Sequence, residues 1–180
     1  MNIRRFRISD LSSVLHIERA SFGREAYSAT TFLAHLFRDR KGAFVAEDEQ
    51  GNVLGYTLVR LSLGWLGPRR GGITSVAVAP AHRRRGIGRA LLEHAVQYLR
   101  ERRVEEADLE VSVTNRAAQS LYEAFGFRRA RLLPHYYGAD RDGLRMVLDL
   151  KGRTASDEET GQPLHESACE ASQVGDDAGC

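Results

Sequence analysis

Hydrophobic residues recur with two different periods along most of the chain. Helical spacing, with apolar positions three and four residues apart, marks four segments that we expect to be helices. In the first of these segments Leu11, Val14, Leu15 and Glu18 fall at that spacing. The segments start after Asp10, Ser28, Gly88 and Asn115. Asp10, Ser28 and Asn115 are residue types that commonly cap a helix N-terminus.

Shorter runs of β-branched and alternating apolar residues lie between the helical segments and predict strands. The expected strands are Asn2–Ile8, Ala43–Ala46, Val53–Leu61, Thr74–Val78, Asp108–Val113, Phe127–Leu133 and Leu144–Leu150. We expect Gly64–Gly72 to be a loop. Helices and strands interspersed in this order predict an α/β domain with a mixed sheet.

The composition changes sharply at the end of the chain. Residues 151–180 hold two basic and seven acidic residues with almost no large apolar side chain, which predicts an acidic, disordered tail. Residues 1–150 form the expected single domain, of ordinary size for one core. Because the whole chain of 180 residues has a formal net charge of +2, the domain itself carries +7. A basic domain suits a polyanionic cofactor or a nucleic acid.

Several classes of protein are disfavoured by the sequence. Both cysteines, Cys169 and Cys180, lie in the tail, so none is available for a disulfide in the domain. No His or Cys cluster has metal-ligand spacing, so we expect no metal site. The first residues, MNIRRFRISD, lack the apolar segment of a signal peptide, and no apolar run is long enough to span a membrane. We therefore expect a cytoplasmic protein with no membrane partner.

One stretch, from Thr74 to Leu92, combines a strand, a basic glycine-containing loop and the start of a helix. The N–H groups in the first turn of a helix lack intrahelical partners, and the helix dipole favours negative charge there. Gly86 and Gly88 have no Cβ, so a ligand can lie against their backbone. This arrangement predicts an anion site for a phosphorylated cofactor. The alternative is an ordinary turn with solvated arginines, because the loop lacks the Lys-Ser/Thr of a P-loop and the third glycine of a dinucleotide fingerprint.

Two motifs carry a resemblance that spans residues 1–150. Arg83-x-x-Gly86-x-Gly88, after Val76-Ala77-Val78, resembles the acetyl-CoA signature of the GNAT superfamily of N-acetyltransferases, Gln/Arg-x-x-Gly-x-Gly/Ala. The second motif is similar to that of the N-terminal acetyltransferases that modify ribosomal proteins in bacteria, and of their archaeal relatives. It consists of Leu109-Glu110-Val111, Asn115, Ala118, Leu121-Tyr122 and Gly126-Phe127.

The resemblance implies a single GNAT-like domain with a twisted, mixed, mostly antiparallel sheet flanked by helices on both faces. It also implies that acetyl-CoA is the co-substrate and that backbone amides of the loop bind its pyrophosphate. The residues expected to contact it are Val76, Ala77, Val78, Arg83, Arg84, Arg85, Gly86, Ile87, Gly88, Arg89 and Asn115. Asn115 is equally well explained as a helix cap, and the arginines as solvated side chains.

Two residues are candidates for proton transfer, on the strength of their positions in the second motif. Glu110 is the candidate general base, acting on the acceptor amine through water, and Tyr122 is the candidate general acid toward the departing thiolate. A phenol with a pKa of about 10 is protonated at neutral pH. The alternatives are a solvated carboxylate on the polar face of a strand and an aromatic that packs in the core.

The acceptor site is expected where the resembled family places a substrate loop, at Phe22–Tyr27. Glu25 is the candidate partner of a peptide ammonium, and Tyr27, Tyr136 and Tyr137 are candidates for lining a peptide slot. Packing aromatics with wet hydroxyl groups are an equally good explanation. An α-amino group, with a pKa of about 8, is roughly a tenth neutral at pH 7, whereas a lysine amine is almost entirely charged.

The expected function is acetyl-CoA-dependent transfer of an acetyl group to the α-amino group of a protein N-terminus, with ribosomal proteins among the candidate acceptors. Two alternatives stay open. One is an acetyltransferase for a lysine side chain or a small-molecule amine, and the other is a non-catalytic acyl-CoA-binding module. Nucleic acid is disfavoured as a direct ligand, because no recognisable motif of basic residues interleaved with aromatics occurs.

Overall fold

The computed structural model describes residues 1–23, 26–38, 42–62 and 69–151. The predicted tail and the acceptor candidate Glu25 lie outside the described residues. The strands are β1 (Asn2–Arg5), β2 (Ala43–Glu47), β3 (Val53–Ser62), β4 (Arg70–Val78), β5 (Glu106–Ser112), β6 (Arg128–Leu133) and β7 (Gly143–Asp149). The helices are α1 (Leu11–Phe22), α2 (Ala29–Arg38), α3 (Ile87–Glu101) and α4 (Arg116–Ala124), with short 3-10 turns at Ile8–Asp10 and Pro80–His82.

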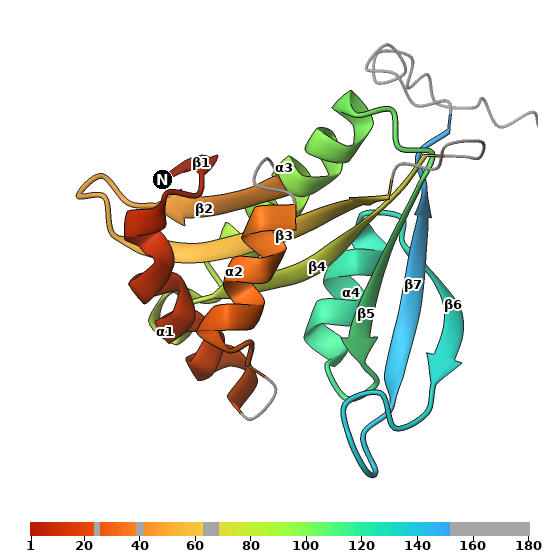
Figure 1. Ribbon diagram of the computed structural model, residues 1–180. Helices are drawn as coiled ribbons and strands as arrows, with labels where there is room; N and C mark the ends of the chain where they lie inside the picture. The colour runs from red at the N-terminus through yellow and green to blue at the C-terminus, as the bar shows by residue number, and fades with distance from the viewer. Residues whose placement is uncertain (24–25, 39–41, 63–68, 152–180) are drawn as a thin grey trace, which may run out of the picture.

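The seven strands form one sheet in the order β1-β2-β3-β4-β5-β7-β6. Every neighbouring pair is antiparallel except β4 and β5, which are parallel. Helices α1 and α2 cover one face of the sheet, and α3 and α4 cover the other (Figure 1). The predicted α/β architecture, a mixed and mostly antiparallel sheet between two helical layers, is confirmed.

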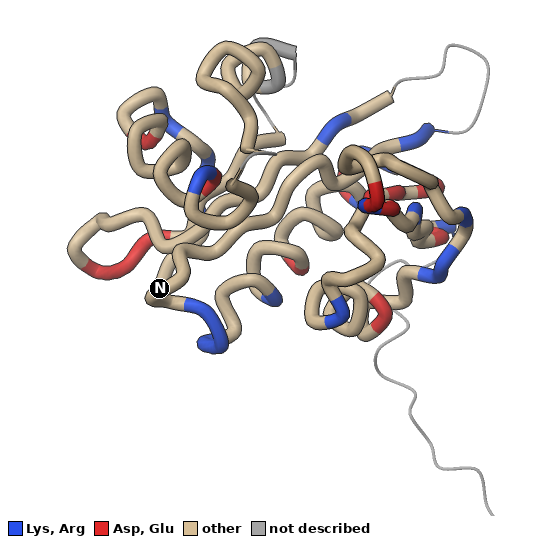
Figure 2. Tube along the Cα trace, turned by 90° about the horizontal axis from the view of Figure 1, so that it is seen from below, with Lys and Arg blue, Asp and Glu red and all other residues tan. Residues whose placement is uncertain are grey.

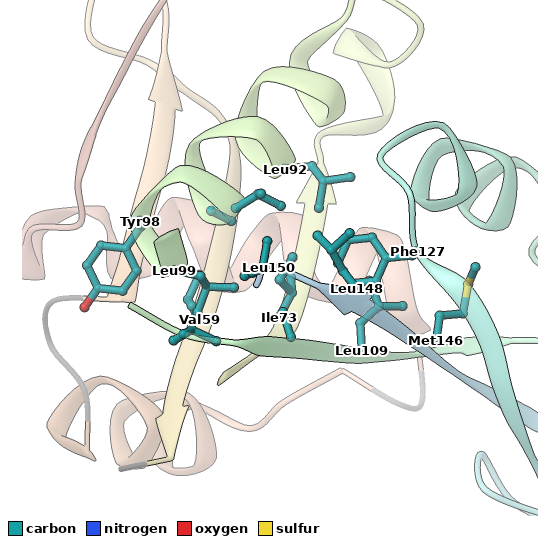
Figure 3. Packing of buried hydrophobic residues seen from close by; sticks show 14 of the residues in the cluster. Val59, Ile73, Leu92, Tyr98, Leu99, Leu109, Phe127, Met146, Leu148 and Leu150 are labelled. Carbon is teal, nitrogen blue, oxygen red and sulfur yellow. The ribbon is translucent and has the colours of Figure 1, made fainter. Parts of the chain in front are cut away.

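The main core lies between α3 and the central strands (Figure 3). Leu92 and Leu99 on α3 are fully buried and pack in one cluster with Val59, Ile73 and Leu109 from three adjacent strands. Burying a leucine completely stabilises a fold by about 1.5–3 kcal/mol. The apolar face of this helix therefore packs in the main core, as its amphipathic pattern indicates.

Strand β5 keeps the alternation that its sequence predicts. Leu109 and Val111 are buried against α3 and α4. Asp108 and Glu110 alternate with them along the strand and so face the opposite side of the sheet, which carries α1 and α2. This strand thus carries carboxylates on one face and core residues on the other.

Strands β4 and β5 pair over only part of their length. Their parallel register runs from Arg70↔Glu106 to Ile73↔Leu109 and ends there. One residue later, at Thr74, β4 has an extra residue relative to β3, since Leu58 pairs with Ser75 but Val59 pairs with Ile73. A bulge of this kind bends a strand and increases its twist. Beyond it β4 turns away from β5 (Figure 1).

The prediction of a loop over Gly64–Gly72 was wrong at its C-terminal end. Arg70, Gly71 and Gly72 belong to β4 and pair with β3 on one side and with β5 on the other. Glycine has little intrinsic strand propensity, so these residues are extended because two neighbouring strands supply hydrogen-bond partners. At Gly71 a Cβ would lie 2.5 Å from Leu99 Cδ2, so the absence of a side chain is what lets α3 pack closely here.

Replacing Gly55 by alanine should destabilise the domain. A Cβ on this residue of β3 would lie 2.7 Å from the Ala77 carbonyl oxygen and 3.1 Å from Leu91 Cδ1, and the carbonyl cannot move without breaking the sheet. We expect Gly55→Ala to lower the free energy of unfolding by about 1–3 kcal/mol, measured by urea denaturation. Gly88→Ala is the control, because its Cβ would make only ordinary contacts of 3.6 and 3.9 Å. Equal stability of the two variants would contradict this account of the β3–β4 contact.

Candidate active site

The divergence of β4 from β5 exposes backbone N–H groups along one edge of β4. The Ala79 N–H donates to the Leu54 carbonyl at 2.9 Å, on the β3 side. N–H groups alternate between the two edges of a strand, so those of Val76 and Val78 face the other edge, from which β5 has departed. The same alternation directs the Ala77 N–H toward β3. Of the three residues of β4 that are predicted to contact acetyl-CoA, Val76 and Val78 therefore present an amide N–H to the open edge.

The loop after β4 is anchored by Arg83. Its Nε donates to the Val78 carbonyl at 3.1 Å and its Nη2 donates to Ser21 Oγ, also at 3.1 Å. This arginine therefore ties the loop to the end of β4 and to α1. Arg84, with φ 65°, and Gly86, with φ 79°, both adopt left-handed backbone conformations that turn the chain into α3.

The anion site is predicted at the N-terminus of α3. Gly86 is the N-cap residue, and the N–H of Ala90 is bonded to its carbonyl at 3.0 Å. The N–H groups of Ile87, Gly88 and Arg89 precede that first helical bond and so have no intrahelical acceptor. A Cβ built on Gly86 would meet no atom within 4 Å, so the space beside this residue is open. The geometry fits a phosphate group held by main-chain donors.

The loop arginines differ in their surroundings. Arg84 and Arg85 are exposed at this end of α3. Arg89 lies over the ring of Phe125, with its guanidinium carbon 5.2 Å from the ring centroid. This cation–π contact joins the first turn of α3 to the end of α4.

Helix α4 places Tyr122 on the α3 side of the sheet. The Asn115 side chain accepts a hydrogen bond from the Ala118 N–H at 3.1 Å, which confirms that Asn115 caps this helix. Tyr122 packs against the main core, with its ring edge-on to Phe127 at a centroid distance of 6.0 Å. Burial disfavours the phenolate and raises the pKa of Tyr122 to about 12. The hydroxyl therefore keeps its proton well above neutral pH.

Glu110 interacts electrostatically with two of the predicted tyrosines on the other face of the sheet. Burial raises the pKa of Tyr136, and the negative charge of Glu110 raises it further. Burial also raises the pKa of Tyr27, with additional contributions from Glu18, Tyr136 and Glu110. Three residues from distant parts of the chain thus share one electrostatic environment. The fourth acceptor candidate, Tyr137, packs edge-on against Tyr136 at a centroid distance of 4.9 Å.

A charged cluster next to Glu110 was not predicted from the sequence. Asp108 is buried, and each of its carboxylate oxygens accepts a hydrogen bond. Oδ1 accepts from Arg60 Nη2 at 2.6 Å, and Oδ2 accepts from Arg145 Nη2. Arg145 also lies directly opposite Glu110 in the β5–β7 register. At Gly72 a Cβ would lie 2.6 Å from the Arg60 guanidinium carbon, so only glycine lets that side chain cross β4.

A second unpredicted group surrounds Glu18, which is 1% exposed on α1. Its carboxylate accepts hydrogen bonds from the Tyr27 N–H at 2.9 Å and from the Tyr56 hydroxyl. The Tyr56 hydroxyl also lies 3.0 Å from Ser75 Oγ. The only signal in the sequence was a glutamate placed within the apolar spacing of the first helix.

Three further features of the described part of the chain concern metal ligands, membrane-spanning helices and the distribution of charge. No group of three or more His, Cys, Asp or Glu residues there is arranged to hold a metal ion. No helix in it is long and apolar enough to cross a membrane. Basic and acidic positions are interspersed along its trace (Figure 2). This distribution differs from the single basic face that is typical of nucleic-acid-binding domains.

Comparison with known proteins agrees with the geometry. The model of the acetyltransferase (GNAT) family matches residues 11–127. An N-alpha-acetyltransferase from Sulfolobus acidocaldarius is 35% identical over 156 residues, which cover 82% of this chain and 92% of the relative.

Two solved structures share the fold. One is the NatC complex bound to Gag peptide and CoA, with a TM-score of 0.77, 25% identity and coverage of 83% of this chain and 98% of the matched chain. The other is the ribosomal-protein-S18-alanine N-acetyltransferase from Escherichia coli, with a TM-score of 0.71, 27% identity and coverage of 86% and 97%.

Asp108→Asn should lower the stability of the domain. The asparagine NH₂ would face one of the two guanidinium groups, so one charge-assisted hydrogen bond is lost and a donor opposes a donor. Because Arg60 and Arg145 are 41% and 45% exposed, solvent compensates part of the loss, and we expect about 1–2 kcal/mol in urea denaturation. Glu49→Gln, at an exposed turn position, should leave the midpoint unchanged. An unchanged free energy of unfolding in Asp108→Asn would show that the cluster does not stabilise the sheet.

Proposed function

This chain belongs to the acetyltransferase (GNAT) family and is an acetyl-CoA-dependent acyltransferase, and we propose that its acceptor is the α-amino group of a protein or peptide N-terminus. The observation that carries the proposal is the electrostatic interaction of Glu110 with Tyr27 and Tyr136, at the point where Glu110 follows the last β4–β5 residue pair. Aromatic side chains around a carboxylate suit an extended peptide that ends in an ammonium group. The relative from Sulfolobus acidocaldarius is itself named an N-alpha-acetyltransferase.

The described residues fit acetyl-CoA at the divergence of β4 and β5. Its phosphates suit the first-turn N–H groups of α3 at Ile87 to Arg89, where the open space beside Gly86 admits a group close to the backbone. When bound, acetyl-CoA supplies a thioester whose carbonyl carbon is attacked by the acceptor nitrogen. The amides of Val76 and Val78 are the available donors for the carbonyl oxygen and for the amide groups of the coenzyme.

Glu110 is the proposed base on the acceptor side. An α-ammonium group, with a pKa of about 8, needs to lose only one proton to become nucleophilic, and roughly a tenth of it has done so at pH 7. For the larger fraction that is still an ammonium group, the Glu110 carboxylate can accept the proton through one water molecule. Tyr27 and Tyr136, whose pKa values the charge of Glu110 raises, are the proposed residues that restrict where the amine can lie.

Tyr122 is the proposed donor to the departing sulfur, on the opposite side of the sheet from Glu110. With a pKa of about 12 its hydroxyl is fully protonated at neutral pH. A thiol has a pKa of about 8.5, so complete transfer of the phenol proton to the thiolate is unfavourable. We therefore propose that Tyr122 donates a hydrogen bond that stabilises the sulfur as negative charge develops on it.

Ribosomal proteins are candidate acceptors, since one structural relative is a ribosomal-protein-S18-alanine N-acetyltransferase. A cytoplasmic location is part of this proposal, because ribosomal proteins are made and assembled there. The deciding experiment incubates the protein with acetyl-CoA and three acceptors and detects products by mass spectrometry. The acceptors are a lysine-free peptide with a free N-terminus, an N-terminally blocked peptide with one lysine, and a polyamine. Acetylation of the first alone supports the proposal, and acetylation of either of the others in its place overturns it.

Glu110→Gln and Tyr122→Phe should each lower kcat by roughly 100-fold, the usual scale for a group that assists proton transfer and for a donor that stabilises developing negative charge. The Glu110→Gln defect should shrink at high pH, where more of the amine is already neutral, whereas the Tyr122→Phe defect should persist. Profiles of kcat against pH with one peptide acceptor distinguish the two roles. Glu106→Gln, on the same face of β5, is the matched control and should behave as wild type. A defect in Glu110→Gln that is equal at all pH values would exclude its role as a base.

Gly86→Asp should weaken acetyl-CoA binding much more than Gly86→Asn. Both side chains tolerate the left-handed conformation at this position, so the two variants share any strain and differ in charge alone. The aspartate places a negative charge where the phosphates bind, and we expect a Kd at least about 10-fold higher than for the asparagine variant, measured by calorimetry. Similar melting temperatures would confirm that both variants are folded. Equal affinities would place the phosphates elsewhere.

A further inference from the structure

The Glu18 carboxylate is buried in the domain and has no part in the proposed chemistry. Moving an ionised carboxylate out of water is costly unless hydrogen bonds replace its hydration. Burial raises the pKa of Glu18, partly offset by its hydrogen bond from the Tyr27 N–H. A residue of this kind in a helix that otherwise buries Val14 and Ile17 needs a physical reason.

The contacts of Glu18 connect two parts of the active site. Through Oε1 it accepts a hydrogen bond from the Tyr27 N–H, in residues 26–28 directly before α2, which we call the acceptor segment because Tyr27 is proposed to line the peptide slot. Through Oε2 it binds the Tyr56 hydroxyl, which in turn reaches Ser75 on β4. Ser75 directly precedes Val76, whose amide faces the open edge. The chain of contacts therefore runs from the acceptor segment to the strand that faces the thioester.

The intermediate residue of this chain is held firmly. The Tyr56 ring is 1% exposed and packs edge-on against Phe32 of α2 at a centroid distance of 5.6 Å. Beside it, Thr57 Oγ1 donates to the Ser75 carbonyl at 3.0 Å and fixes the backbone of β4 at the bulge. Neither the Tyr27 end nor the Ser75 end of this series of contacts can shift without disturbing packed side chains.

An ionised carboxylate satisfies both donors that meet at Glu18. The Tyr27 N–H and the Tyr56 O–H each point at one of its oxygens, and an ionised carboxylate accepts at both without offering a donor. A glutamine of the same shape would turn its NH₂ toward one of them, and it would fit only if the Tyr56 hydroxyl reversed and donated to Ser75 Oγ instead. An apolar residue would leave both without this acceptor.

We propose that Glu18 is a positioning residue that locks the acceptor segment at Tyr27 to strand β4 at Ser75. The acceptor amine and the thioester are thereby held at a fixed separation, on which the rate of attack depends steeply. This inference rests on the proposed acceptor side at Tyr27. Glu18 itself touches neither substrate.

The kinetic experiment measures kcat/KM for the acceptor amine and, separately, the Kd for acetyl-CoA. We expect Glu18→Gln, Glu18→Ala and Tyr56→Phe to lower kcat/KM for the acceptor by about 10-fold or more, while the Kd for acetyl-CoA is unchanged. Asp10→Asn is the matched control. Asp10 is also buried near the start of α1 and accepts from the Arg7 N–H at 2.7 Å and from Arg4, but it belongs to the β1 side of the domain. The Asp10→Asn variant should therefore be less stable than the wild type but keep the wild-type kcat/KM.

A second measurement tests the lock without catalysis. Hydrogen exchange of the Tyr27 amide, followed by NMR, should be slow in the wild type and clearly faster in Glu18→Ala, with the amides of β3 unaffected. Unchanged exchange, or an equal loss of kcat/KM in Asp10→Asn, overturns the proposal. A joint weakening of acceptor and acetyl-CoA binding would also overturn it, because it would indicate general destabilisation.

Failure of this inference is distinguishable from failure of the proposed function. If the wild type acetylates a lysine or a polyamine instead of an N-terminus, the proposed acceptor is wrong. The Glu18 comparison is then run with the amine that is acetylated, and the same outcomes apply. The exchange measurement needs no acceptor at all.

Discussion

The parallel pairing of β4 with β5 ends after four residue pairs, and the rest of the site depends on that interruption. A bulge at Thr74 bends β4 away, so main-chain donors at Val76 and Val78 face an edge with no strand among the described residues. Buried backbone N–H groups almost always find partners, and an edge left open in the middle of a sheet therefore favours a ligand with acceptors of its own. Acetyl-CoA, with amide and thioester carbonyls, has that chemistry.

The same interruption gives access to both faces of the sheet at one point. Glu110 lies on the face that carries α1 and α2, whereas Tyr122 on α4 packs against the other face. An intact sheet would separate the two side chains completely. Because the strands diverge between them, one residue can serve the acceptor amine and the other the departing sulfur. The proposed chemistry is thus distributed across the sheet.

Buried polar contacts on the acceptor face fix the strands around the opening. Asp108 joins β3, β5 and β7 through two arginines, and Glu18 joins α1 to β3 and to the segment before α2. Carboxylates of this kind stabilise little when weighed against an apolar core, but they accept hydrogen bonds only in defined directions. Their contribution here is orientation, which a site with two substrates requires.

Local pattern in the sequence was enough to determine most elements and one half of the site. Helix caps such as Ser28 and Asn115, the alternation on β5 and the glycine loop before α3 are short-range signals, and each has the predicted structure. Tertiary structure alone decided that Arg70–Gly72 is a strand, because two neighbouring strands supply its hydrogen-bond partners. It also decided which partners meet Asp108 and Glu18, since Arg145 is 37 residues from Asp108 and Tyr56 is 38 residues from Glu18. Short-range periodicity shows which face a side chain occupies, but the partner across the sheet depends on strand order and register, which arise only when the whole chain packs.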